Sequence, residues 1–534
     1  MAGHPHAVRS DARVVVVGAG VGGLVAALLT ACRGHPVTLV ETHDGPGGKM
    51  RPLIVDGVPI DAGPTVFTMR WIFDEILARA GTTLEDLVQI DRLEVLARHA
   101  WRGRPGWLDL HATRGRSVEA IADFAGLAEA RRFDAFCDEA ARVYRELEGP
   151  VIRSSRPALL QLVGDLGIRG LASLTALGPL TSLATSLRRR LHDPRLQQLF
   201  GRYATYCGAS PWQAPATLML VAHVEMAGVW AVRGGMRALA QSLAALAERR
   251  GVQIRYGQRC ERLLVEGGRV AGVELAGGER LPAEHVVFNG DVAALARGLL
   301  GPAARPAVPA RVLRETRSLS AVTWAMRARA EGMPLVRHNV FFDDDYAGEF
   351  DDIFGHGRLP RRGTVYLCAQ DRLDDGEAPR GADGKERLLA LVNAPAIGDR
   401  HAFDGAEIDP WQTSSLDLLA QCGTRLTTSH AGQTVRRTPA EFERLFPATG
   451  GALYGMATHG WMALLRRQGA LTALPGLYLA GGSVHPGPGV PMAAMSGALA
   501  AATLQARLDS TSRSSRVLIG GGTSMPSATT AATR

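Results

Sequence analysis

Only two of the 60 Lys and Arg residues are lysines, Lys49 and Lys385, and aromatic residues make up only 6% of this chain. A nucleic-acid interface gathers basic residues on one element with aromatic residues among them, whereas the arginines here are scattered along the sequence. The net charge of +8 is therefore interpreted as mostly solvated surface. We expect no nucleic-acid partner.

Cysteines are few, and none of them is close to another in the sequence. Isolated thiols without CxxC spacing are typical of a reducing compartment, so we expect a cytoplasmic protein with no disulfide framework and no metal site. The acidic run at residues 343–345 is an alternative metal site, but consecutive acids on loops are usually solvated. The six cysteines are Cys32, Cys137, Cys207, Cys260, Cys368 and Cys422.

Residues 14–32 lack charged side chains, yet the glycines in this stretch argue against a membrane helix or a signal peptide. An apolar strand is followed by the pattern Gly-x-Gly-x-x-Gly at Gly18, Gly20 and Gly23, and then by a helical run. Gly18 permits the tight turn, Gly20 lets the backbone approach a pyrophosphate, and Gly23 allows close packing of helix and strand. The helix N-terminus presents N–H groups and a positive dipole end to the phosphates. We expect a dinucleotide site and no transmembrane segment.

A second apolar strand, at residues 37–40, ends at Glu41. An acid at this position accepts hydrogen bonds from the ribose hydroxyls and would repel the 2′-phosphate of NADP. A further glycine pair with Lys49 follows closely. The interior of the chain has no second fingerprint of this kind, so the sequence predicts one bound dinucleotide.

The hydrophobic pattern predicts a nucleotide-binding domain in three pieces, interrupted by two other blocks. The last piece ends in a helix from Met492 to Leu508, and the tail beyond it is rich in Ser, Thr, Gly and Ala, which predicts disorder. The expected ranges are 12–70, 234–305 and 446–508 for nucleotide binding, 71–233 for a helical substrate and membrane region, 306–445 for a substrate domain, and 509–534 for the tail.

Four motifs resemble those of the phytoene-desaturase family of FAD-dependent carotenoid oxidoreductases, within the wider amine-oxidase-like flavoprotein group. The resemblance spans residues 12–508. It implies an α/β fold with a Rossmann-like FAD-binding domain of the glutathione-reductase/amine-oxidase type, assembled from discontinuous segments, plus a mixed substrate domain and a helical membrane-associating region. The motifs are residues 18–24, Glu41 with residues 47–49, residues 61–65, and residues 479–491.

The resemblance implies FAD as the cofactor, and the absence of any cysteine after Cys422 favours non-covalent binding. Residues 488–492 predict a helix N-terminus after a glycine-rich turn, whose N–H groups can face the negative charge that develops on a reduced flavin. Pro491 suits the first helical turn, and an ordinary capped helix is the alternative. The predicted FAD-binding residues are Gly18, Gly20, Gly22, Gly23, Glu41, Gly48, Lys49, Gly481, Gly482, Ser483, Val490, Pro491 and Met492.

Within the family, residues 63–71 and 201–211 look most like the purple-bacterial 1-hydroxycarotenoid 3,4-desaturases. This implies C3–C4 desaturation of an acyclic 1-hydroxycarotenoid, such as 1-hydroxyneurosporene, in carotenoid biosynthesis. Phytoene desaturation and carotenoid isomerisation are alternatives on the same scaffold. A non-catalytic prenyl-lipid carrier, similar to GDP-dissociation inhibitors, is the alternative of a different class, and the intact fingerprint disfavours it. The electron acceptor, oxygen or a quinone, and the catalytic base stay open.

Three single residues and one longer segment also carry alternatives. His485 is either catalytic or structural, and Glu225 and Arg233 either line a substrate tunnel or form surface ion pairs.

Residues 157–190 combine recurring leucines with one acid and the run Arg188, Arg189 and Arg190. This pattern is typical of interfacial helices and equally of a buried core helix. We expect peripheral association with the membrane surface.

Overall fold

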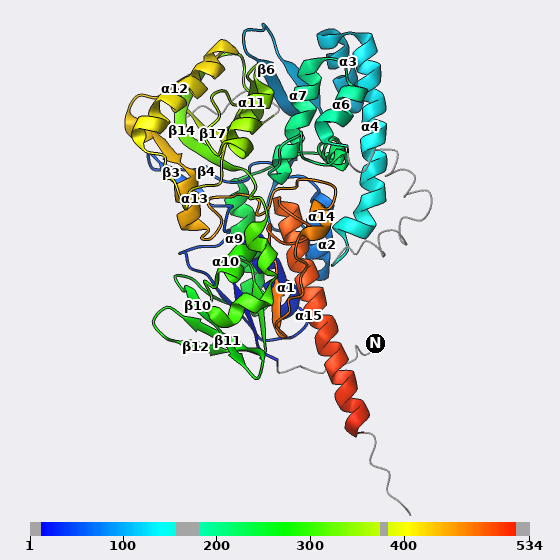
Figure 1. The fold of residues 1–534 in the computed structure, drawn as a ribbon, viewed down its shortest axis with the longest axis vertical. Helices are drawn as coiled ribbons and strands as arrows, with labels where there is room; N and C mark the ends of the chain where they lie inside the picture. The colour runs from blue at the N-terminus through cyan, green and yellow to red at the C-terminus, as the bar shows by residue number, and fades with distance from the viewer. Residues whose placement is uncertain (1–11, 156–180, 374–382, 520–534) are drawn as a thin grey trace, which may run out of the picture.

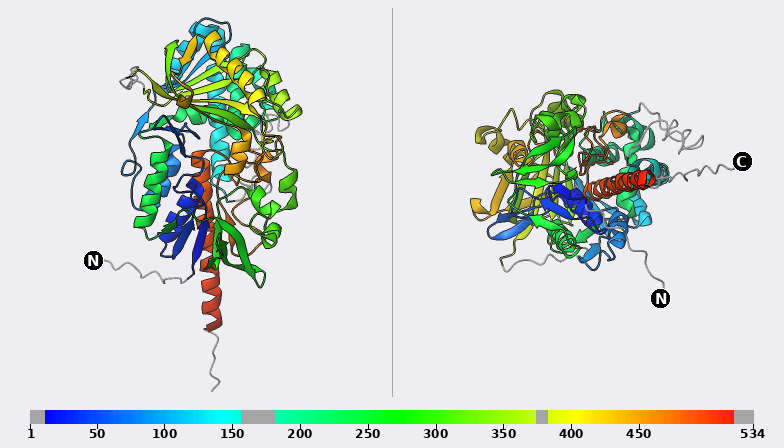
Figure 2. Two further views of the ribbon diagram at one scale, coloured as in Figure 1. Left: turned by 90° about the vertical axis from the view of Figure 1, so that its left-hand side faces the viewer. Right: turned by 90° about the horizontal axis from the view of Figure 1, so that it is seen from below.

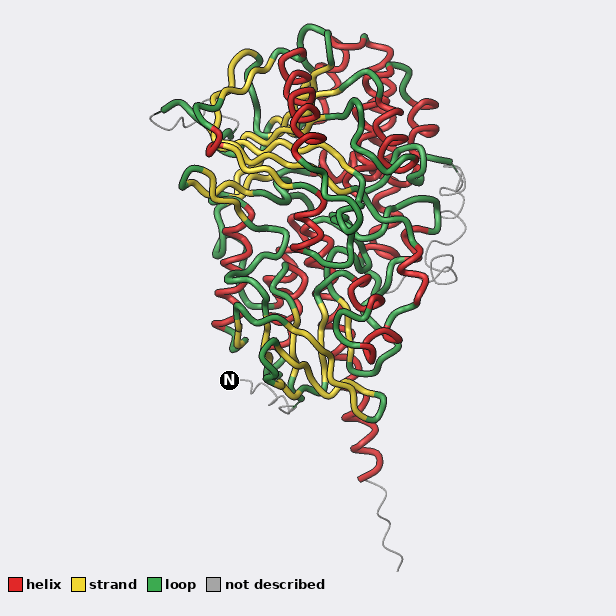
Figure 3. Tube along the Cα trace, turned by 60° about the vertical axis from the view of Figure 1, so that its left-hand side comes forward, coloured by secondary structure: helices red, strands yellow, loops and turns green. Residues whose placement is uncertain are grey.

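The computed structural model describes residues 12–155, 181–373 and 383–519. It contains two large sheets, one towards each end of the long axis (Figure 1). In Figure 3 the strands, drawn in yellow, gather into an upper and a lower group with helices and loops between them. The two sheets therefore define two regions, and most of the predicted FAD-binding residues directly follow strands of the lower one.

The lower region is built on a five-stranded parallel sheet with the order β20–β13–β1–β2–β9. Its strands come from three stretches of chain that are far apart in the sequence, which confirms an α/β fold assembled from discontinuous segments. The central strand β1 pairs in parallel with β13 on one side and β2 on the other. The strands are β1 (Val14–Val17), β2 (Val37–Val40), β9 (Gln253–Arg255), β13 (His285–Phe288) and β20 (Leu477–Leu479).

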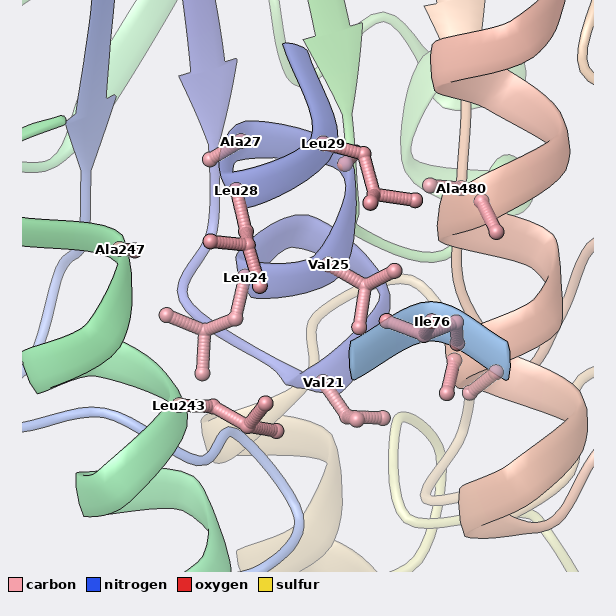
Figure 4. Close-up of a cluster of buried hydrophobic side chains, with 14 of the residues drawn as sticks. Val21, Leu24, Val25, Ala27, Leu28, Leu29, Ile76, Leu243, Ala247 and Ala480 are labelled. Carbon is pink, nitrogen blue, oxygen red and sulfur yellow. The ribbon is translucent and has the colours of Figure 1, made fainter. Parts of the chain in front are cut away.

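Helix α1 (Val21–Ala31) is buried along almost its whole length because it packs among helices α2 (Arg70–Arg79), α9 (Met236–Arg249) and α15 (Val490–Ile519). Its apolar side chains point into this cluster, together with Ile76, Leu243, Ala247 and Ala480 (Figure 4). This packing explains why an uncharged stretch here is core rather than membrane helix: burial on all sides requires apolar residues all round.

Helix α15 is longer than the sequence predicts. It begins at Val490, two positions before Met492, and it continues to Ile519 instead of ending at Leu508. Residues 511–519, predicted as disordered, are helical and extend away from the body of the protein (Figure 2). A helix whose first turns are anchored by packing extends at low cost, because each added residue gains a hydrogen bond without a new nucleation step. Residues 520–534 lie outside the described residues.

A mixed sheet forms the upper region, with the order β18–β14–β17–β16–β15–β6–β7 and β19 also paired with β14. Strands β6 and β7 lie within residues 71–233, the region predicted as helical. The parallel pairing of β6 with β15 is a long-range contact that local periodicity does not report. The strands are β6 (Val95–Trp101), β7 (Leu108–His111), β14 (Ser320–Gly332), β15 (His338–Phe342), β16 (Val365–Ala369), β17 (Glu386–Ala394), β18 (Thr424–Thr427) and β19 (Thr434–Arg437).

Helices pack beside this sheet around a buried aromatic group, Phe133, Phe136 and Phe200. These helices are α3 (Arg114–Ala125), α4 (Leu127–Leu147), α6 (Leu183–Arg190), α7 (Pro194–Gly201) and α8 (Leu220–Ala227), with the 3₁₀ turn η2 (Arg202–Cys207) after α7. Strands β10 (Cys260–Glu266), β11 (Arg269–Leu275) and β12 (Arg280–Pro282) form a separate three-stranded sheet, and helix α12 (Gly405–Gln421) packs on the upper sheet. The remaining elements are β3 (Pro52–Val55), β4 (Val58–Asp61), β5 (Ile90–Arg92), β8 (Trp230–Val232), the π-helix η1 (Glu148–Ile152), α10 (Val292–Arg297), α11 (Tyr346–Phe350), α13 (Pro439–Leu445) and α14 (Ala463–Arg466).

The proposed membrane segment is only partly visible, since residues 156–180 lie outside the described residues. At its end, helix α6 buries Leu183 and Leu187 in the protein core. Arg190 forms an ion pair with Glu139, whereas Arg188 and Arg189 are exposed. Among the described helices, none has the length and apolar character needed to cross a bilayer.

Candidate active site

The turn between β1 and α1 is a loop of glycines packed against one asparagine. Gly18 has a positive φ of 101°, and a Cβ atom on Gly20 would lie 2.8 Å from the Nδ2 of Asn289. Asn289 Nδ2 donates a hydrogen bond of 3.1 Å to the carbonyl of Gly18. A Cβ atom on Gly23 would lie 2.0 Å from the same carbonyl, so close packing requires glycine here. The sequence pattern gave Asn289 no role, although it follows β13 directly.

Gly20 is the N-cap of α1, and within the described chain no side chain caps this helix. The N–H groups of its first turn are therefore left for another partner, and the small loop lets a phosphate approach them. This arrangement fits the diphosphate of FAD. Gly22 also faces Asn289: a Cβ atom there would be 2.7 Å from Asn289 Oδ1, and 2.9 Å from both the Ala493 carbonyl and the Gly481 nitrogen. Gly22 thus allows α1 to approach α15, and its predicted contact with FAD stays a prediction.

Glu41 lies at the end of β2, where the sequence places it, and it is 7% exposed. Its Oε2 accepts a 2.6 Å hydrogen bond from the Ala19 N–H, and its Oε1 accepts one of 3.0 Å from the His43 N–H. The carboxylate is therefore held beside the glycine loop. Each carboxylate oxygen keeps a second lone pair, so this geometry is compatible with ribose hydroxyls as additional donors.

Residues 47–49 form a second wall of the same site. The Gly47 N–H donates to the Ala19 carbonyl at 2.8 Å, and a Cβ atom on Gly48 would lie 3.0 Å from the Gly20 Cα. Lys49 donates from Nζ to the Leu453 carbonyl. Burial lowers the pKa of Lys49, and the charge of Asp291 partly offsets this shift. Lys49 therefore connects the nucleotide loops to the segment around Leu453.

The last predicted motif surrounds the start of α15. Gly481 has a φ of 110° and donates from its N–H to Ser496 Oγ at 3.2 Å, while Ser483 Oγ accepts from the Val292 N–H at 3.3 Å. Arg467, which the sequence did not indicate, donates to the carbonyls of Gly482 and Tyr454. The predicted residues Val490, Pro491 and Met492 all lie in the first turn of α15.

His485 is held by the protein on one side of its ring. Its Nε2 is 2.7 Å from the Val151 carbonyl in η1, and the residue is 2% exposed. Nδ1 has no hydrogen-bond partner among the described residues. Burial lowers the pKa of His485 to about 4, so the ring is neutral near pH 7 and is a weak proton acceptor. These contacts favour the structural interpretation of His485.

A buried polar cluster lies on η2 and α8. Glu225 accepts hydrogen bonds from the hydroxyls of Tyr203 at 2.5 Å and Tyr206 at 2.7 Å. Arg202 donates to the same Tyr206 hydroxyl at 3.1 Å. Burial raises the pKa of Glu225, and the two phenol hydrogen bonds oppose that shift. Glu225 is therefore an interior residue, whereas Arg233 forms an ion pair with Asp91 at the surface.

The neighbouring strands complete this cluster. The Tyr366 hydroxyl on β16 is 2.6 Å from Thr65 Oγ1 and 2.7 Å from the Nδ1 of His338 on β15. Arg202 lies over the rings of both tyrosines, 5.2 Å from the Tyr206 centroid and 5.4 Å from the Tyr366 centroid. The guanidinium thus joins η2 to the upper sheet. Arg202, Tyr203, Tyr206 and Thr65 belong to motifs that the sequence singled out, and Glu225 was a candidate by itself, whereas no sequence pattern indicated Tyr366 or His338.

One segment of chain links this polar cluster to the nucleotide loops. The Leu453 carbonyl accepts a hydrogen bond from Lys49, and the carbonyl of the next residue, Tyr454, accepts one from Arg467. A Cβ atom on Gly208, just after η2, would lie 2.8 Å from the Tyr454 ring. The polar cluster and the predicted flavin end of the nucleotide site are therefore on two sides of the same segment.

Similarity to known proteins identifies the protein family. A family model described as flavin-containing amine oxidoreductase matches residues 21–384. Putrescine oxidase with bound putrescine has a similar fold, with a TM-score of 0.58 and 14% identity over 93% of this chain and 99% of that one. The protein therefore belongs to the flavin-containing amine oxidoreductase family, and FAD is its cofactor.

Relatives with higher sequence identity identify the type of enzyme within this family. The chain is 63% identical to the hydroxyneurosporene desaturase of Rubrivivax gelatinosus over 519 residues, which cover 97% of this chain and 98% of the relative. It is 45% identical to the hydroxyneurosporene desaturase of Cereibacter sphaeroides, over 94% of this chain and 99% of the relative. The 1-hydroxycarotenoid 3,4-desaturase of Flavobacterium sp. is 27% identical over 92% and 98%. The chain is thus a carotenoid desaturase of the phytoene-desaturase type.

Proposed function

We propose that this protein introduces the C3–C4 double bond into an acyclic 1-hydroxycarotenoid such as 1-hydroxyneurosporene. The observation that carries this proposal is the 63% identity to a hydroxyneurosporene desaturase over nearly the full length of both chains. A second, independent feature supports it. The buried cluster around Arg202 is polar, and apolar core residues surround it. A long polyene with one terminal hydroxyl needs this combination, since its chain is apolar and its end is polar.

The reaction removes a hydride and a proton from two neighbouring carbons, and bound FAD supplies the acceptor for the electron pair. The protein residues hold that cofactor and place the substrate against it. In the proposal, Glu41 accepts hydrogen bonds from the adenosine ribose, and the first turn of α1 holds the diphosphate. The first turn of α15, with Val490, Pro491 and Met492, would stabilise the negative charge of the reduced flavin through its free N–H groups.

The test compares three substrates with the purified flavoprotein: 1-hydroxyneurosporene, neurosporene and phytoene. We expect the 1-hydroxylated substrate to lose two hydrogens at C3–C4, which lengthens the conjugated system and moves its absorption to longer wavelength. Efficient conversion of phytoene would favour a phytoene desaturase. A product of unchanged mass would indicate an isomerase, and a preparation that retains no flavin would favour the prenyl-lipid carrier.

We also propose that the protein associates peripherally with the cytoplasmic membrane surface and passes its electrons to oxygen or a quinone. A carotenoid substrate resides in the bilayer, so access to it is simplest at that surface. The exposed side chains of Arg188 and Arg189 support this proposal, because anionic headgroups attract basic residues.

A further inference from the structure

Arg202 is a buried cation without a carboxylate in direct contact. It is 9% exposed, and among the described residues its guanidinium has one hydrogen-bond acceptor, the hydroxyl of Tyr206, and no ion pair. Burial lowers the pKa of Arg202, but the interactions with Tyr206 and Glu225 raise it by more, so the guanidinium stays charged. A buried guanidinium has five N–H donors to satisfy, and native structures rarely leave such donors unpaired.

The tyrosine hydroxyls around Arg202 already form hydrogen bonds with other residues. Tyr203 and Tyr206 both donate to Glu225, and the Tyr366 hydroxyl is shared between Thr65 and His338. Arg202 therefore retains N–H donors for a ligand. Its position is fixed by the ring of Tyr206 on one element and the ring of Tyr366 on another.

A second polar atom in the cluster also lacks a protein partner. His338 is 3% exposed, and its Nε2 has no hydrogen-bond partner among the described residues, while its Nδ1 is bound to Tyr366. Burial, with the charges of Arg337 and Arg202, lowers the pKa of His338 well below its ordinary value, so its ring is neutral. Arg202 and His338 both lie next to Tyr366 and both keep unpaired polar atoms, which indicates that a small polar group of a ligand belongs here.

We propose that Arg202 donates a hydrogen bond to the terminal hydroxyl of the carotenoid, and that Tyr206 and Glu225 are positioning residues for its guanidinium. This inference rests on the proposed function and names the residue that would give it specificity. A hydroxyl oxygen is a neutral acceptor that matches the free donors of Arg202. A substrate without the hydroxyl would leave those donors unpaired in a dry site, which is how polar sites reject analogues that lack a hydroxyl.

The test measures a ratio, because a ratio separates recognition of the hydroxyl from a general loss of activity. For each variant, Kd is measured from the absorption change of the bound polyene, and kcat/KM from turnover. The preference for the hydroxyl is the ratio of each value between 1-hydroxyneurosporene and neurosporene. We expect wild-type protein to favour the hydroxylated substrate by about tenfold to a hundredfold. In Arg202→Met this preference should fall to about threefold or less. Tyr206→Phe, which removes the acceptor that orients Arg202, should reduce the preference by a smaller factor.

A matched control variant is Arg98→Met. Arg98 is equally buried at 9% exposed, but its guanidinium binds Asp109 at 2.7 and 2.8 Å on the upper sheet. Its loss should weaken folding without changing the preference for the hydroxyl. If Arg202→Met does not fold because a nearby positive charge no longer offsets the buried Glu225 carboxylate, the double variant Arg202→Met/Glu225→Gln removes that carboxylate and is measured instead.

Two failures can be told apart. If wild-type protein prefers the hydroxylated substrate and the Arg202 variants keep that preference, the assignment of Arg202 is overturned while the proposed function stands. If wild-type protein converts neither hydroxylated substrate nor neurosporene at C3–C4, the proposed function itself fails. A preference lost in Arg202→Met and retained in Arg98→Met supports the inference.

Discussion

Gly497 in α15 lies so close to Gly22 in α1 that a Cβ atom at position 497 would be 2.1 Å from the Gly22 carbonyl oxygen. The backbones of the two helices are therefore in direct contact. This contact ties the last part of the chain to the first nucleotide loop, because Gly22 follows the turn that holds Gly18 and Gly20. The position of α15, and with it the turn at Val490, depends on the absence of a side chain at Gly497.

The first prediction concerns this contact. Gly497→Ala should destabilise the protein by about 1–3 kcal/mol, since an added methyl group overlaps backbone atoms that cannot move aside. Retention of FAD should fall with it, measured as the ratio of flavin to protein absorbance after gel filtration. Gly115→Ala in α3 is the control: a Cβ atom there meets nothing within 4 Å, so better helix propensity should stabilise slightly. Equal melting temperatures for Gly497→Ala and wild type would refute the close-contact argument.

The second prediction concerns Glu41 and the way FAD is bound. Glu41→Arg should abolish flavin retention, because it removes the acceptor for the ribose hydroxyls and leaves the Ala19 N–H without its 2.6 Å partner. Acid precipitation of wild-type protein should release all flavin to the supernatant, as non-covalent binding requires. The exposed Glu119 provides the control Glu119→Arg, which should retain flavin. Flavin that stays in the acid pellet would contradict the non-covalent assignment.

Much of the lower region could be predicted from the sequence because its signals are local. The glycines at 18, 20 and 23, the strand before them and the acid at Glu41 are short-range patterns with a mechanical cause. The return of distant segments to the same sheet was also visible, because each returning strand is a short apolar run next to glycines.

The polar cluster could not be derived in this way. Arg202, Glu225, Tyr366 and His338 come from four elements, and only the packing of η2 against β16 shows that they meet. The pairing of β6 with β15 was hidden for the same reason, since tertiary contacts rather than local periodicity decide it. The extension of α15 beyond Leu508 was missed because polar composition suggested disorder, whereas an anchored helix propagates.

The third prediction concerns pH and His485. The folded protein holds this ring neutral with a pKa of about 4, while an unfolded chain titrates near the ordinary value of 6.5. Between these two values the unfolded state binds more protons, so the free energy of unfolding should decrease as pH falls from about 6.5 to 4. His485→Gln keeps a donor for the Val151 carbonyl and should remove about 1–3 kcal/mol of this dependence.

Other buried groups titrate in the same range, so the test is the difference between variants. Thermal unfolding of wild type, His485→Gln and the exposed control His430→Gln is compared at several pH values. The control should follow wild type. If His485→Gln also follows wild type throughout, the ring is not held neutral by its surroundings.

The last prediction concerns the membrane and uses the difference between three adjacent arginines. Arg190 forms an ion pair with Glu139, whereas Arg188 and Arg189 are exposed at the end of α6. The double variant Arg188→Glu/Arg189→Glu should therefore release the protein from anionic vesicles without disturbing the fold, whereas Arg190→Glu would place two carboxylates together and destabilise it. Each basic residue near an anionic surface contributes on the order of 1 kcal/mol, and salt weakens the effect.

Vesicle flotation at low and high salt measures this directly. The double variant Arg33→Glu/Arg425→Glu makes the same change in charge at two exposed positions outside α6 and should still float with the vesicles. If both double variants lose binding equally, the attraction comes from the net charge of +8 rather than from this surface. If neither loses it, Arg188 and Arg189 do not face the membrane. Loss confined to the α6 variant would place the entry side for a bilayer-dissolved substrate next to the helices that carry Arg202.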